Sequence, residues 1–589
     1  MEVNIMADVN LKINGMECTA PAGSTILQAA KLNNIDIPTL CYLKDTNEIG
    51  ACRICVVEVK GARSLVASCV YPINEGMEVY TNSPKVLAAR KKTLQLILSD
   101  HDKKCLSCVR SGDCELQKLC RQYGVDDENL YEGVANTFEI DDTAAHMFRD
   151  NNKCILCRRC VAACAKTQGI GVIGANERGF KTNIGSAFEV GLGETSCVCC
   201  GQCIAVCPTG ALYEKDYTDE IVAALNDPEK LVFVQTAPAV RAGLGEMFGY
   251  PIGTNVEGKM AAALRRIGFN KVFDTNFGAD LTIMEEGTEF IHRVQNGGIL
   301  PMITSCSPGW IKFCEHYYPD MIPNLSTCKS PQQMFGATLK TYYADKMGID
   351  PKSIVSVSVM PCTAKKFEIQ RDDQSAAGEG IPDLDYSITT RELGRLIKRF
   401  GIDFTALPDE GFDDPMGEGS GAAVIFGATG GVMEAALRTV VWKLTGEKDN
   451  SPIEFKEVRG TEGIKEATYK VGDLDVNICV ASGLANARKV LDSVKSGEKK
   501  YHFIEIMACP GGCVNGGGQP QVHASIRNFE DIRALRAQAL YSSDEKNVIR
   551  FSHENKSIQT LYKEWFGEPG SEKAHHALHT SYVARKINE

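Results

Sequence analysis

Two copies of one cysteine spacing constrain what this chain can fold into more than any other feature. The spacing C-x2-C-x2-C-x3-C begins at Cys154 and again at Cys197, and Pro208 follows the second copy. Bacterial two-cluster ferredoxins have this spacing, and in them the fourth cysteine of each run ligates the other cluster. Zinc explains such a tandem run poorly. We therefore predict two [4Fe–4S] clusters with exchanged fourth ligands: one held by Cys154, Cys157, Cys160 and Cys207, the other by Cys164, Cys197, Cys200 and Cys203.

The setting of these cysteines favours metal binding over disulfides. The chain has 25 cysteines in 589 residues, and its first residues, MEVNIMADVNLKING, lack the basic and apolar regions of a signal peptide. We therefore expect a cytoplasmic protein, in which reduced thiols act as ligands or redox centres. A net charge of −11 argues against nucleic acid or an anionic membrane as partner, and no apolar run is long enough to span a membrane.

Two further cysteine groups precede the tandem run. Cys41, Cys52, Cys55 and Cys69 have a spacing close to that of plant-type [2Fe–2S] ferredoxins, with structural zinc as the alternative. The segment HDKKCLSCVRSGDC supplies His101, Cys105, Cys108 and Cys114. One histidine and three cysteines are also a common zinc set. The position of this group between two iron–sulfur candidates favours a [4Fe–4S] cluster with one imidazole ligand.

The pattern of apolar residues divides the chain into four predicted domains. VNLKINGM (9–16) predicts a β-hairpin and STILQAAKLNN a helix, which together suit a β-grasp [2Fe–2S] ferredoxin-like domain at 1–85. A charged helical stretch from 85 to 135 suits a small domain at 86–145 for the cluster with one histidine and three cysteines, and the two-[4Fe–4S] ferredoxin domain takes 146–215. From 216 to 589, the runs KLVFVQTA, IVSVSVMP and GAAVIFGAT predict strands that alternate with the helical segments GVMEAALRTVVWKL and TTRELGRLIKRF. The fold class is thus multidomain α+β and α/β, ending in a large α/β domain with helices over a largely parallel sheet.

Three motifs in the α/β part carry the remaining patterned cysteines. These are TSCSPGW (304–310), MPCTAKKFE (360–368) and EIMACPGGCVNGGGQP (505–520). The glycines around Cys509 and Cys513 would let the backbone close on a bulky inorganic ligand. Cys18, Cys120, Cys314, Cys328 and Cys479 lie outside every pattern and are expected to be ordinary buried thiols, and Cys199 to be only a neighbour of its cluster run.

Together the three motifs resemble the signature segments of the [FeFe]-hydrogenases, and the resemblance extends over essentially the whole chain, accessory groups included. It implies catalysis of 2H⁺ + 2e⁻ = H₂ at an H-cluster, a cubane joined through a cysteine thiolate to a two-iron subsite with CO, cyanide and azadithiolate. It implies that Cys362, Cys509 and Cys513 hold the cubane, and that Lys365 hydrogen-bonds a cyanide. Pocket residues implied by the resemblance are Met360, Met507, Gln332, Ala237, Pro238 and Pro361.

The resemblance also implies a proton relay through Glu286, Ser326 and Glu289. Family members usually have two adjacent cysteines in the first motif, one for proton transfer and one for the cubane. Here Cys306 aligns with the relay position and Ser307 with the ligand position. A thiol suits proton transfer because its pKa lies near neutrality, whereas iron prefers thiolate to alkoxide. Cys306 as relay with Ser307 near the cubane is the preferred hypothesis, and Cys306 as ligand with Ser307 in the proton path is the alternative.

The implied cofactors are one [2Fe–2S] cluster, three accessory [4Fe–4S] clusters and the H-cluster, with no nucleotide or flavin on this chain. The segment from Val172 to Cys203 resembles hydrogenase subunits of NADH-dependent, electron-bifurcating complexes and complex I-type cluster subunits. The expected partners are a flavin/NAD(P)-binding diaphorase-like subunit, ferredoxin and the hydrogenase maturation proteins. The alternatives are a stand-alone ferredoxin-dependent hydrogenase, an electron-relay subunit of a complex I-like or formate dehydrogenase assembly, and a hydrogenase-like assembly or sensor protein.

Overall fold

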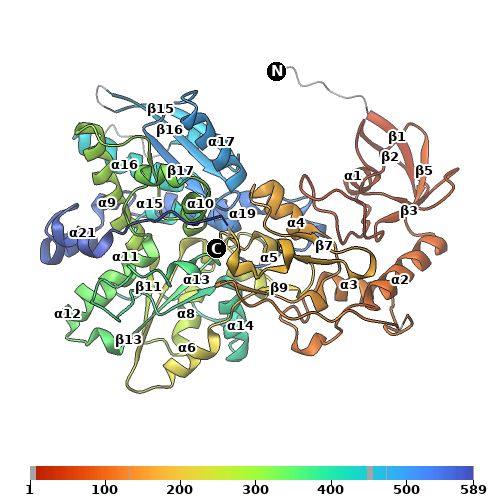
Figure 1. Ribbon diagram of the computed structural model, residues 1–589, viewed down its shortest axis with the longest axis horizontal. Coiled ribbons are helices and arrows are strands. Elements are labelled where there is room, and N and C mark those ends of the chain that lie inside the picture. Colours follow the sequence, from red (N-terminus) through yellow and green to blue (C-terminus); the bar gives the residue numbers. More distant parts are fainter. Residues whose placement is uncertain (1–7, 132, 447–454, 472–473, 588–589) are drawn as a thin grey trace.

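The N-terminal part of the chain is a small sheet domain set apart from the larger body (Figure 1). The computed structural model describes residues 8–131, 133–446, 455–471 and 474–587. Five strands form the first sheet in the order β2-β1-β5-β3-β4, with α1 (Ile26–Leu32) beside it. The strands are β1 (Asp8–Ile13), β2 (Met16–Pro21), β3 (Val56–Val59), β4 (Val66–Ala67) and β5 (Met77–Tyr80). The predicted hairpin is confirmed: β1 pairs antiparallel with β2, and Asn14 and Gly15 take positive φ values of 52° and 81° in the turn.

The second part contains less helix than the sequence predicts. Helix α2 (Pro84–Leu98) and helix α3 (Glu115–Gln122) lie within the predicted stretch, but the described residues between Gln122 and 135 form no helix. Gly124 has a φ of 57°, a conformation that ends a helix, and the following residues VDDENL offer no continuous apolar face. The prediction of a helical stretch from about 85 to 135 was therefore wrong after Gln122, and between α2 and α3 it holds only for the 3-10 turn Cys105–Ser107.

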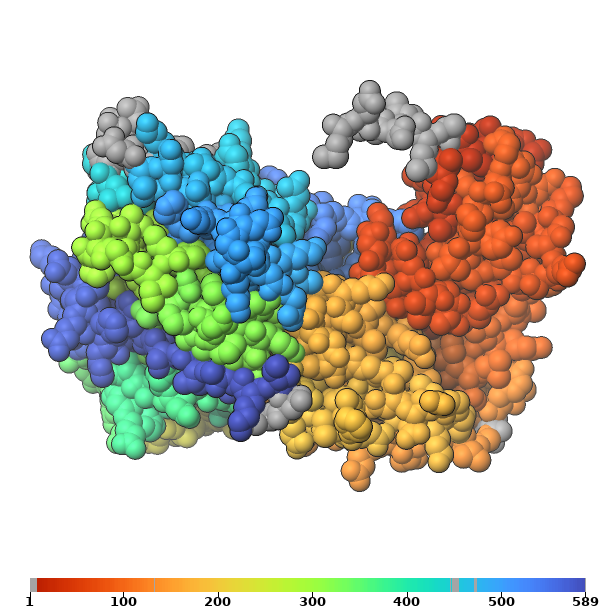
Figure 2. All heavy atoms as spheres, turned by 45° about the horizontal axis from the view of Figure 1, so that its top comes forward, coloured from red at the N-terminus to blue at the C-terminus, as the bar shows by residue number. Residues whose placement is uncertain are grey.

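The tandem cysteine repeat is also a repeat of backbone geometry. Short helices α4 (Arg159–Ala162) and α5 (Gln202–Val206) follow residues with left-handed backbones, Arg158 and Gly201, at equivalent positions of the two runs. Leu156 and Cys199 also share a positive φ, 54° and 60°. Two small antiparallel pairs complete this part: β6 (Met147–Arg149) with β9 (Leu212–Glu214), and β7 (Gly174–Asn176) with β8 (Asn183–Gly185). Figure 2 shows this part, in yellow-orange, between the N-terminal domain and the α/β part of the chain.

The α/β part contains two four-stranded sheets, where the sequence suggested a single one. The first is wholly parallel, in the order β11-β10-β13-β14: β11 (Lys271–Asp274), β10 (Leu231–Thr236), β13 (Ile354–Met360) and β14 (Tyr386–Thr389). The second has the order β12-β17-β16-β15: β12 (Met302–Ile303), β17 (Phe503–Met507), β16 (Leu474–Ser482) and β15 (Ile464–Val471). Only β15 runs antiparallel to its neighbour.

Helices surround both sheets in Figure 1, and the predicted helices at 390 and 431 are confirmed. The α-helices of the α/β part are α6 (Thr218–Leu225), α7 (Pro238–Arg241), α8 (Glu257–Ile267), α9 (Thr275–Gln295), α10 (Pro308–Tyr317), α11 (Pro331–Thr338), α12 (Ala344–Met347), α13 (Lys365–Glu368), α14 (Thr390–Arg399), α15 (Gly421–Val424), α16 (Gly431–Thr445), α17 (Leu484–Lys495), α18 (Ala524–Arg527), α19 (Ile532–Lys546), α20 (Lys556–Leu561) and α21 (Glu572–Leu578). No helix in the described parts of the chain is long and apolar enough to cross a membrane.

One predicted strand is a helix. GAAVIFGAT (421–429) folds as α15 followed by the 3-10 turn η12 (Ile425–Gly427). All nine residues are buried, and α15 packs against α19, α16 and α9. A short apolar run that is buried on every side has no periodicity by which helix and strand can be told apart.

Candidate functional site

The carboxyl ends of strands from both sheets meet around one cavity of about 90 Å³. Residues that directly follow β10, β13 and β17 line it, as does the segment after β12 that leads into α10. Ligands of α/β proteins commonly bind beyond the carboxyl ends of parallel strands. The wall is mostly apolar, and five cysteines contribute to it: Cys200, Cys306, Cys362, Cys509 and Cys513.

Three of these cysteines are the predicted cubane ligands. Cys362 follows β13, Cys509 follows β17, and Cys513 begins the 3-10 turn η14 (Cys513–Asn515). Burial raises the pKa of each thiol above its ordinary value, in Cys513 to about 12. Neighbouring thiols in this set raise the pKa of Cys509 and Cys513 further. These thiols are soft donors that lie close together and, with raised pKa values, do not ionise without a metal. Such a set suits a metal cluster, because binding of the cluster releases the thiol protons.

Glycines allow the last motif to close around this cavity. Gly512 has a φ of 93°, and a Cβ atom there would lie 2.6 Å from the backbone nitrogen of Thr429. A Cβ atom on Gly516 would lie 2.1 Å from the carbonyl oxygen of Pro361. The two loops that carry the three cysteines therefore pack at a distance that only glycine permits, as the sequence suggested.

Lys365 places a buried ammonium group beside the cavity. It donates to Ser330 Oγ at 2.7 Å, to Glu368 Oε2 at 2.7 Å and to the carbonyl oxygen of Cys306 at 3.4 Å. Gln332 donates to the same Glu368 oxygen at 3.0 Å. The apolar wall, the sulfur donors and this cation together fit a bulky anionic metal group. The other predicted pocket residues, Ala237, Pro238, Met360, Pro361 and Met507, all line the cavity.

Cys306 and Ser307 both line the cavity but have different neighbours. Ser307 Oγ accepts a 3.2 Å hydrogen bond from the backbone nitrogen of Ala508, next to Cys509. Burial raises the pKa of Cys306 well above its usual range, and the nearby Glu286 and Cys513 raise it further. Cys306 is thus close to the predicted relay carboxylate, and Ser307 is close to the predicted cubane loop.

The predicted relay residues lie together beside Cys306. Glu286 and Glu289 are on one face of α9, and neither carboxylate oxygen of Glu286 has a hydrogen-bond partner among the described residues. Burial and then the charge of Glu289 raise the pKa of Glu286 to about 8. Ser326 Oγ donates to Glu289 at 2.9 Å, and Glu289 forms a 2.6 Å ion pair with Arg293. A carboxyl with a pKa near neutrality can both hold and release a proton under ordinary conditions.

The accessory cysteines gather in the predicted groups. Cys55 and Cys69 sulfurs lie 3.3 Å apart, and the backbone nitrogen of Cys52 approaches Cys41 Sγ at 3.5 Å. Burial, and then nearby charges that include Cys207, raise the pKa of Cys154, Cys157 and Cys160, which places Cys207 with the first run. Burial, and then nearby charges that include Cys164, raise the pKa of Cys200 and Cys203, which places Cys164 with the second. Cys207 thus lies near the first run and Cys164 near the second, although Cys207 also lies near Cys203. This proximity is compatible with exchanged fourth ligands, which stay a prediction, and Cys197 lies in the second run close to Cys199.

In the group with one histidine and three cysteines, the imidazole of His101 is available as a metal ligand. Burial lowers the pKa of His101 to about 4, which leaves the ring neutral, and its Nδ1 atom has no hydrogen-bond partner in the part of the chain that the structure describes. Burial raises the pKa of Cys114, and nearby Cys108 adds to the rise. Cys105 is exposed, so this group reaches the protein surface. The sequence alone did not single out Cys120, whose pKa is raised by burial and by nearby Cys114 and Cys105.

Hydrogen bonds join the accessory cysteine groups to one another. Asn47 Nδ2 donates to the carbonyl oxygens of Cys41 and Cys157 at 2.9 and 3.0 Å. Arg110 donates to the carbonyl oxygen of Cys207 at 3.1 Å. Cys200 borders the catalytic cavity as well as the space between the tandem runs. The Cys41 group thus meets the Cys154 run at Cys157, and the His101 group meets Cys207, the last cysteine of the Cys197 run. The Cys197 run also borders the cavity through Cys200.

Sequence reasoning missed several residues that the fold brings to these sites. Glu368 stands in a motif that was noted, but its contact with Lys365 was not expected. Arg293 lies one helical turn after Glu289, a spacing that could have suggested the ion pair. His146 and Arg159 gave no signal in the sequence. Arg159 is buried, binds Glu115 through two hydrogen bonds of 2.9 and 3.1 Å, and its positive charge favours the thiolate forms of both Cys41 and Cys157.

The fold and these sites define an iron–sulfur oxidoreductase with a buried catalytic cavity. Residues 230–517 match the family described as iron only hydrogenase large subunit, C-terminal domain, and residues 530–585 match iron hydrogenase small subunit. The N-terminal matches are a 2Fe-2S iron-sulfur cluster binding domain (6–84), the NADH-ubiquinone oxidoreductase-G iron-sulfur binding region (90–129) and a 4Fe-4S dicluster domain (153–211).

Similar proteins cover the chain from end to end. The NADP-reducing hydrogenase subunit HndD of Solidesulfovibrio fructosivorans is 52% identical in an alignment of 592 positions that covers 99% of this chain and 100% of the relative. Iron hydrogenase 1 of Clostridium pasteurianum is 46% identical and covers 97% of this chain and 99% of its own length. The apo [FeFe]-hydrogenase HydA1 of Chlamydomonas reinhardtii superposes with a TM-score of 0.56 at 45% identity, over 63% of this chain and 100% of that structure.

The chain therefore belongs to the iron-only, or [FeFe], hydrogenase family and is a catalytic subunit with iron–sulfur cofactors.

Proposed function

We propose that this chain interconverts 2H⁺ + 2e⁻ and H₂ at an H-cluster in the cavity beyond β10, β13 and β17. In this proposal, Cys362, Cys509 and Cys513 hold the cubane, and one [2Fe–2S] and three accessory [4Fe–4S] clusters carry electrons. The observation that supports it most is the convergence of three separate motifs on one buried cavity with a sulfur-rich wall. When bound, the two-iron subsite supplies the redox chemistry of H₂, and the protein supplies electrons, protons and a dry pocket.

Electrons would enter or leave through the second cluster run. Cys200 borders the cavity, and Thr363, next to Cys362, donates to the carbonyl oxygen of Cys199 at 2.8 Å. From there the two tandem clusters would connect to the Cys41 group through Asn47 and to the His101 group through Arg110. Both peripheral groups thus offer an entry point for a redox partner.

Protons would move between the cavity and the surface along Cys306, Glu286, Ser326 and Glu289. Glu286 is the step best suited to exchange a proton near neutral pH, because burial and the charge of Glu289 raise its pKa to about 8. Glu289 and its partner Arg293 are each partly exposed, with side-chain exposures of 14% and 13%. The outer end of the relay therefore reaches water, while the inner end stays dry.

The neighbours of the first motif support Cys306 as the relay thiol and Ser307 as the residue beside the cubane. Cys306 is close enough to Glu286 for the carboxylate charge to add to the rise in pKa that burial causes. Ser307 Oγ instead accepts from the loop that carries Cys509. In the alternative assignment Cys306 would be a ligand, and the relay would begin at a hydroxyl that bonds away from Glu286.

We further propose that the chain works in a complex with a flavin/NAD(P)-binding, diaphorase-like subunit and with ferredoxin. This is supported by the name of the relative HndD, an NADP-reducing hydrogenase subunit, and by the match of residues 90–129 to an NADH-ubiquinone oxidoreductase region. Use of both electron carriers together would be electron bifurcation. We also propose that the hydrogenase maturation proteins install the two-iron subsite.

A stand-alone ferredoxin-dependent hydrogenase is the second candidate. It is favoured by Iron hydrogenase 1, whose name mentions no partner and whose length this chain matches almost completely. Anaerobic affinity purification from the native host separates the two candidates. A co-eluting flavoprotein with H₂-dependent NAD(P) reduction supports the complex, and a lone chain that reduces only ferredoxin contradicts it.

Infrared spectroscopy of the anaerobically matured protein under H₂ tests the catalytic proposal itself. CO and cyanide bands are expected from a two-iron subsite. Their absence from protein with a full iron load and competent maturation would contradict an H-cluster in this cavity.

A further inference from the structure

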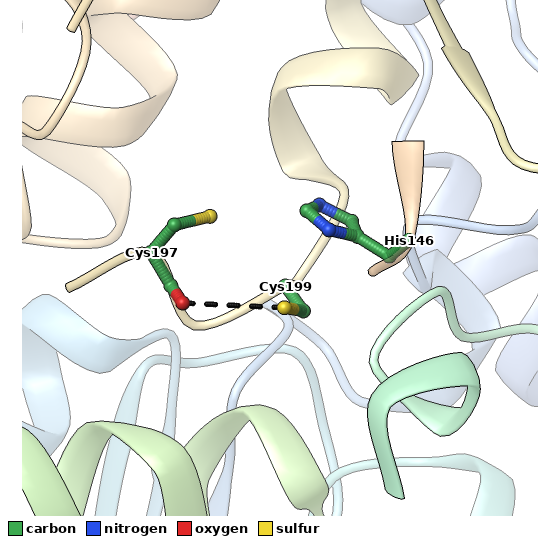
Figure 3. A group of neighbouring side chains, drawn as sticks. All are labelled: His146, Cys197 and Cys199. Atoms are coloured by element: carbon green, nitrogen blue, oxygen red, sulfur yellow. Dashed lines mark hydrogen bonds between the residues drawn. The ribbon is translucent and has the colours of Figure 1, made fainter. Parts of the chain in front are cut away.

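His146 is a fully buried imidazole that lies beside two cysteines, Cys197 and Cys199. It directly precedes β6, its exposure is 1%, and neither Nδ1 nor Nε2 has a hydrogen-bond partner among the described residues. Figure 3 shows its ring facing the sulfur-bearing side chains of Cys197 and Cys199. A ligating nitrogen of His146 and the two sulfur atoms all lie within 4.8 Å of one another.

A buried ring of this kind needs a partner. Leaving a buried polar group without a hydrogen bond costs about 1–3 kcal/mol, and such groups are nearly always paired in proteins. Whichever tautomer it adopts, a neutral imidazole has one N–H donor. The acceptors that the fold brings close to it are sulfur atoms, which become strong acceptors only when they carry negative charge.

The cluster predicted at Cys164, Cys197, Cys200 and Cys203 would supply that charge. Its cysteine ligands are bound as thiolates, and its sulfides add further electron density. Four cysteines already complete the ligand set of a cubane, so the ring is available as a hydrogen-bond donor. This step rests on the function proposed above, because it requires a cubane at these four cysteines.

We propose that His146 donates an N–H hydrogen bond to the sulfur shell of this cubane, at or beside Cys197, and thereby raises the reduction potential of the cluster. Reduction adds one negative charge to the cluster, and a hydrogen bond stabilises the more negative state more strongly. Hydrogen bonds to the sulfurs are among the features that set cluster potentials. His146 is thus a positioning residue for electron transfer that does not touch the reacting atoms.

A second hydrogen-bond donor in the same place, the ammonium group of Lys312, acts in the same direction. Lys312 Nζ lies 3.7 Å from Cys199 Sγ. Cys199 itself projects from the left-handed position between Cys197 and Cys200, and its thiol points to the carbonyl oxygen of Cys197 at 4.0 Å. Two donors, His146 and Lys312, therefore lie on the side of the proposed cubane where Cys197 and Cys199 stand.

Because this cluster lies next to the cavity, a change in its reduction potential should affect turnover. The cluster at Cys200 is the last electron carrier before the cavity. A higher potential favours its reduction, so electrons released by H₂ oxidation move outward onto it more readily. Removal of the donor would make this step less favourable while the ligands of the cluster remain in place.

Redox titration of the holoenzyme, followed by electron paramagnetic resonance, tests the proposal with His146→Phe and His146→Gln. In His146→Phe the ratio of reduced to oxidised cluster at a fixed potential should fall about tenfold, or about 59 mV for a one-electron couple. His146→Gln keeps an N–H donor and should retain most of the wild-type potential. His502→Phe is the matched control, since that ring accepts its hydrogen bond from the backbone nitrogen of Asn477.

The outcomes separate this inference from the function on which it rests. If the wild-type protein shows no signal from this cubane, the cluster assignment fails. If the signal is present and His146→Phe titrates as wild type does, the hydrogen bond is refuted and the cluster assignment stands. Should His146→Phe fail to assemble its clusters, the redox titration is replaced by pulsed electron paramagnetic resonance on wild-type protein with ¹⁵N-labelled histidine. A weak nitrogen coupling that His146→Gln abolishes supports a donor. The proposal is overturned if His146→Gln instead abolishes a strong coupling typical of a ligand, or if it abolishes no coupling at all; the coupling of His101 should persist in this variant.

Discussion

Ser326 Oγ donates a hydrogen bond of 2.9 Å to Glu289 Oε2. Glu286, one helical turn before Glu289, is completely buried, and neither of its carboxylate oxygens has a bonded partner among the described residues. Ser326 thus lies close to both carboxylates, of which only Glu289 forms an ion pair in the described part of the chain. The proposed relay therefore has a dry inner end at Glu286 and an ion-paired outer end at Glu289.

Glu286→Gln should abolish most of the turnover without removing iron. An amide cannot release a proton as a carboxylic acid does, and loss of a general acid–base group typically costs about 10²–10⁴-fold. We expect H₂ production to fall at least about 100-fold while the iron content and the infrared bands persist. The adjacent Glu285→Gln is the matched control, because Glu285 bonds to Tyr562 and to the backbone nitrogen of Gly570. Near-normal activity in Glu286→Gln would show that protons take another route.

The same carboxyl should make the stability of the metal-free protein depend on pH. Burial and the charge of Glu289 raise the pKa of Glu286 from 4.5 to about 8 on folding, so the folded state binds more protons between these values. Its favourable contribution is therefore complete below about pH 4.5 and is lost as the pH rises towards 8. The difference is on the order of a few kcal/mol. Thermal melts from about pH 5 to 8 should show a flatter profile for Glu286→Gln than for wild type, and parallel profiles would contradict the raised pKa.

Two substitutions in the first motif distinguish the roles of its two polar residues. If Cys306 is the relay thiol, Cys306→Ser should keep the full iron content and the CO and cyanide bands, and should lose at least about 100-fold in turnover. Ser307→Ala, the paired variant, should disturb the spectrum of the cubane and leave proton transfer intact. Loss of the cubane in Cys306→Ser would instead support Cys306 as an iron ligand.

A buried ion pair between the cluster part and the catalytic part should carry stability that an exposed pair does not. Glu214 on β9 accepts from Arg391 Nη2 at 2.7 Å and from Arg395 Nη1 at 2.9 Å. Removing one partner of a buried pair typically costs about 3–5 kcal/mol. Glu214→Ala should therefore lower the unfolding free energy by about that amount. Asp219→Asn, which breaks the exposed pair with Arg399, should change it by less than about 1 kcal/mol.

The pKa of Glu214 gives that pair a pH signature. Although burial opposes it, the charges of Arg391 and Arg395 hold the pKa of this carboxyl well below its usual range. A depressed pKa in the folded state contributes stability above the unfolded pKa of 4.5, and that contribution is lost as the pH falls. Denaturant melts at about pH 7 and about pH 4 should show that the wild-type protein loses its advantage over Glu214→Ala on acidification. A constant difference would contradict the depressed pKa.

The sequence predicted best the features that depend on neighbours along the chain. The tandem cysteine spacing is matched by a repeat of backbone geometry, with left-handed residues Arg158 and Gly201 at equivalent positions, whereas the exchange of Cys164 and Cys207 between the clusters stays a prediction. The hairpin at Asn14 and Gly15 and the helices at 390 and 431 likewise depend on local turn chemistry and periodicity. The two wrong predictions, a strand at 421–429 and a helix after Gln122, also came from local patterns. A run buried on all sides has no period, and a charged run does not need to be helical.

Only the tertiary structure decided which side chains meet where separate helices and strands end. Sequence alone predicted the cavity residues through resemblance, but their meeting requires strands from two sheets to end at one place. The contacts of Arg159 with two cysteine groups and of His146 with Cys197 had no sequence signal, because they join segments whose separation is set by packing. Lys365 and Glu368, by contrast, are three residues apart on α13, a spacing that could have suggested their ion pair. Spacing along the chain determined which residues could bind iron, whereas burial and the approach of distant side chains determined the charges and hydrogen bonds around each site.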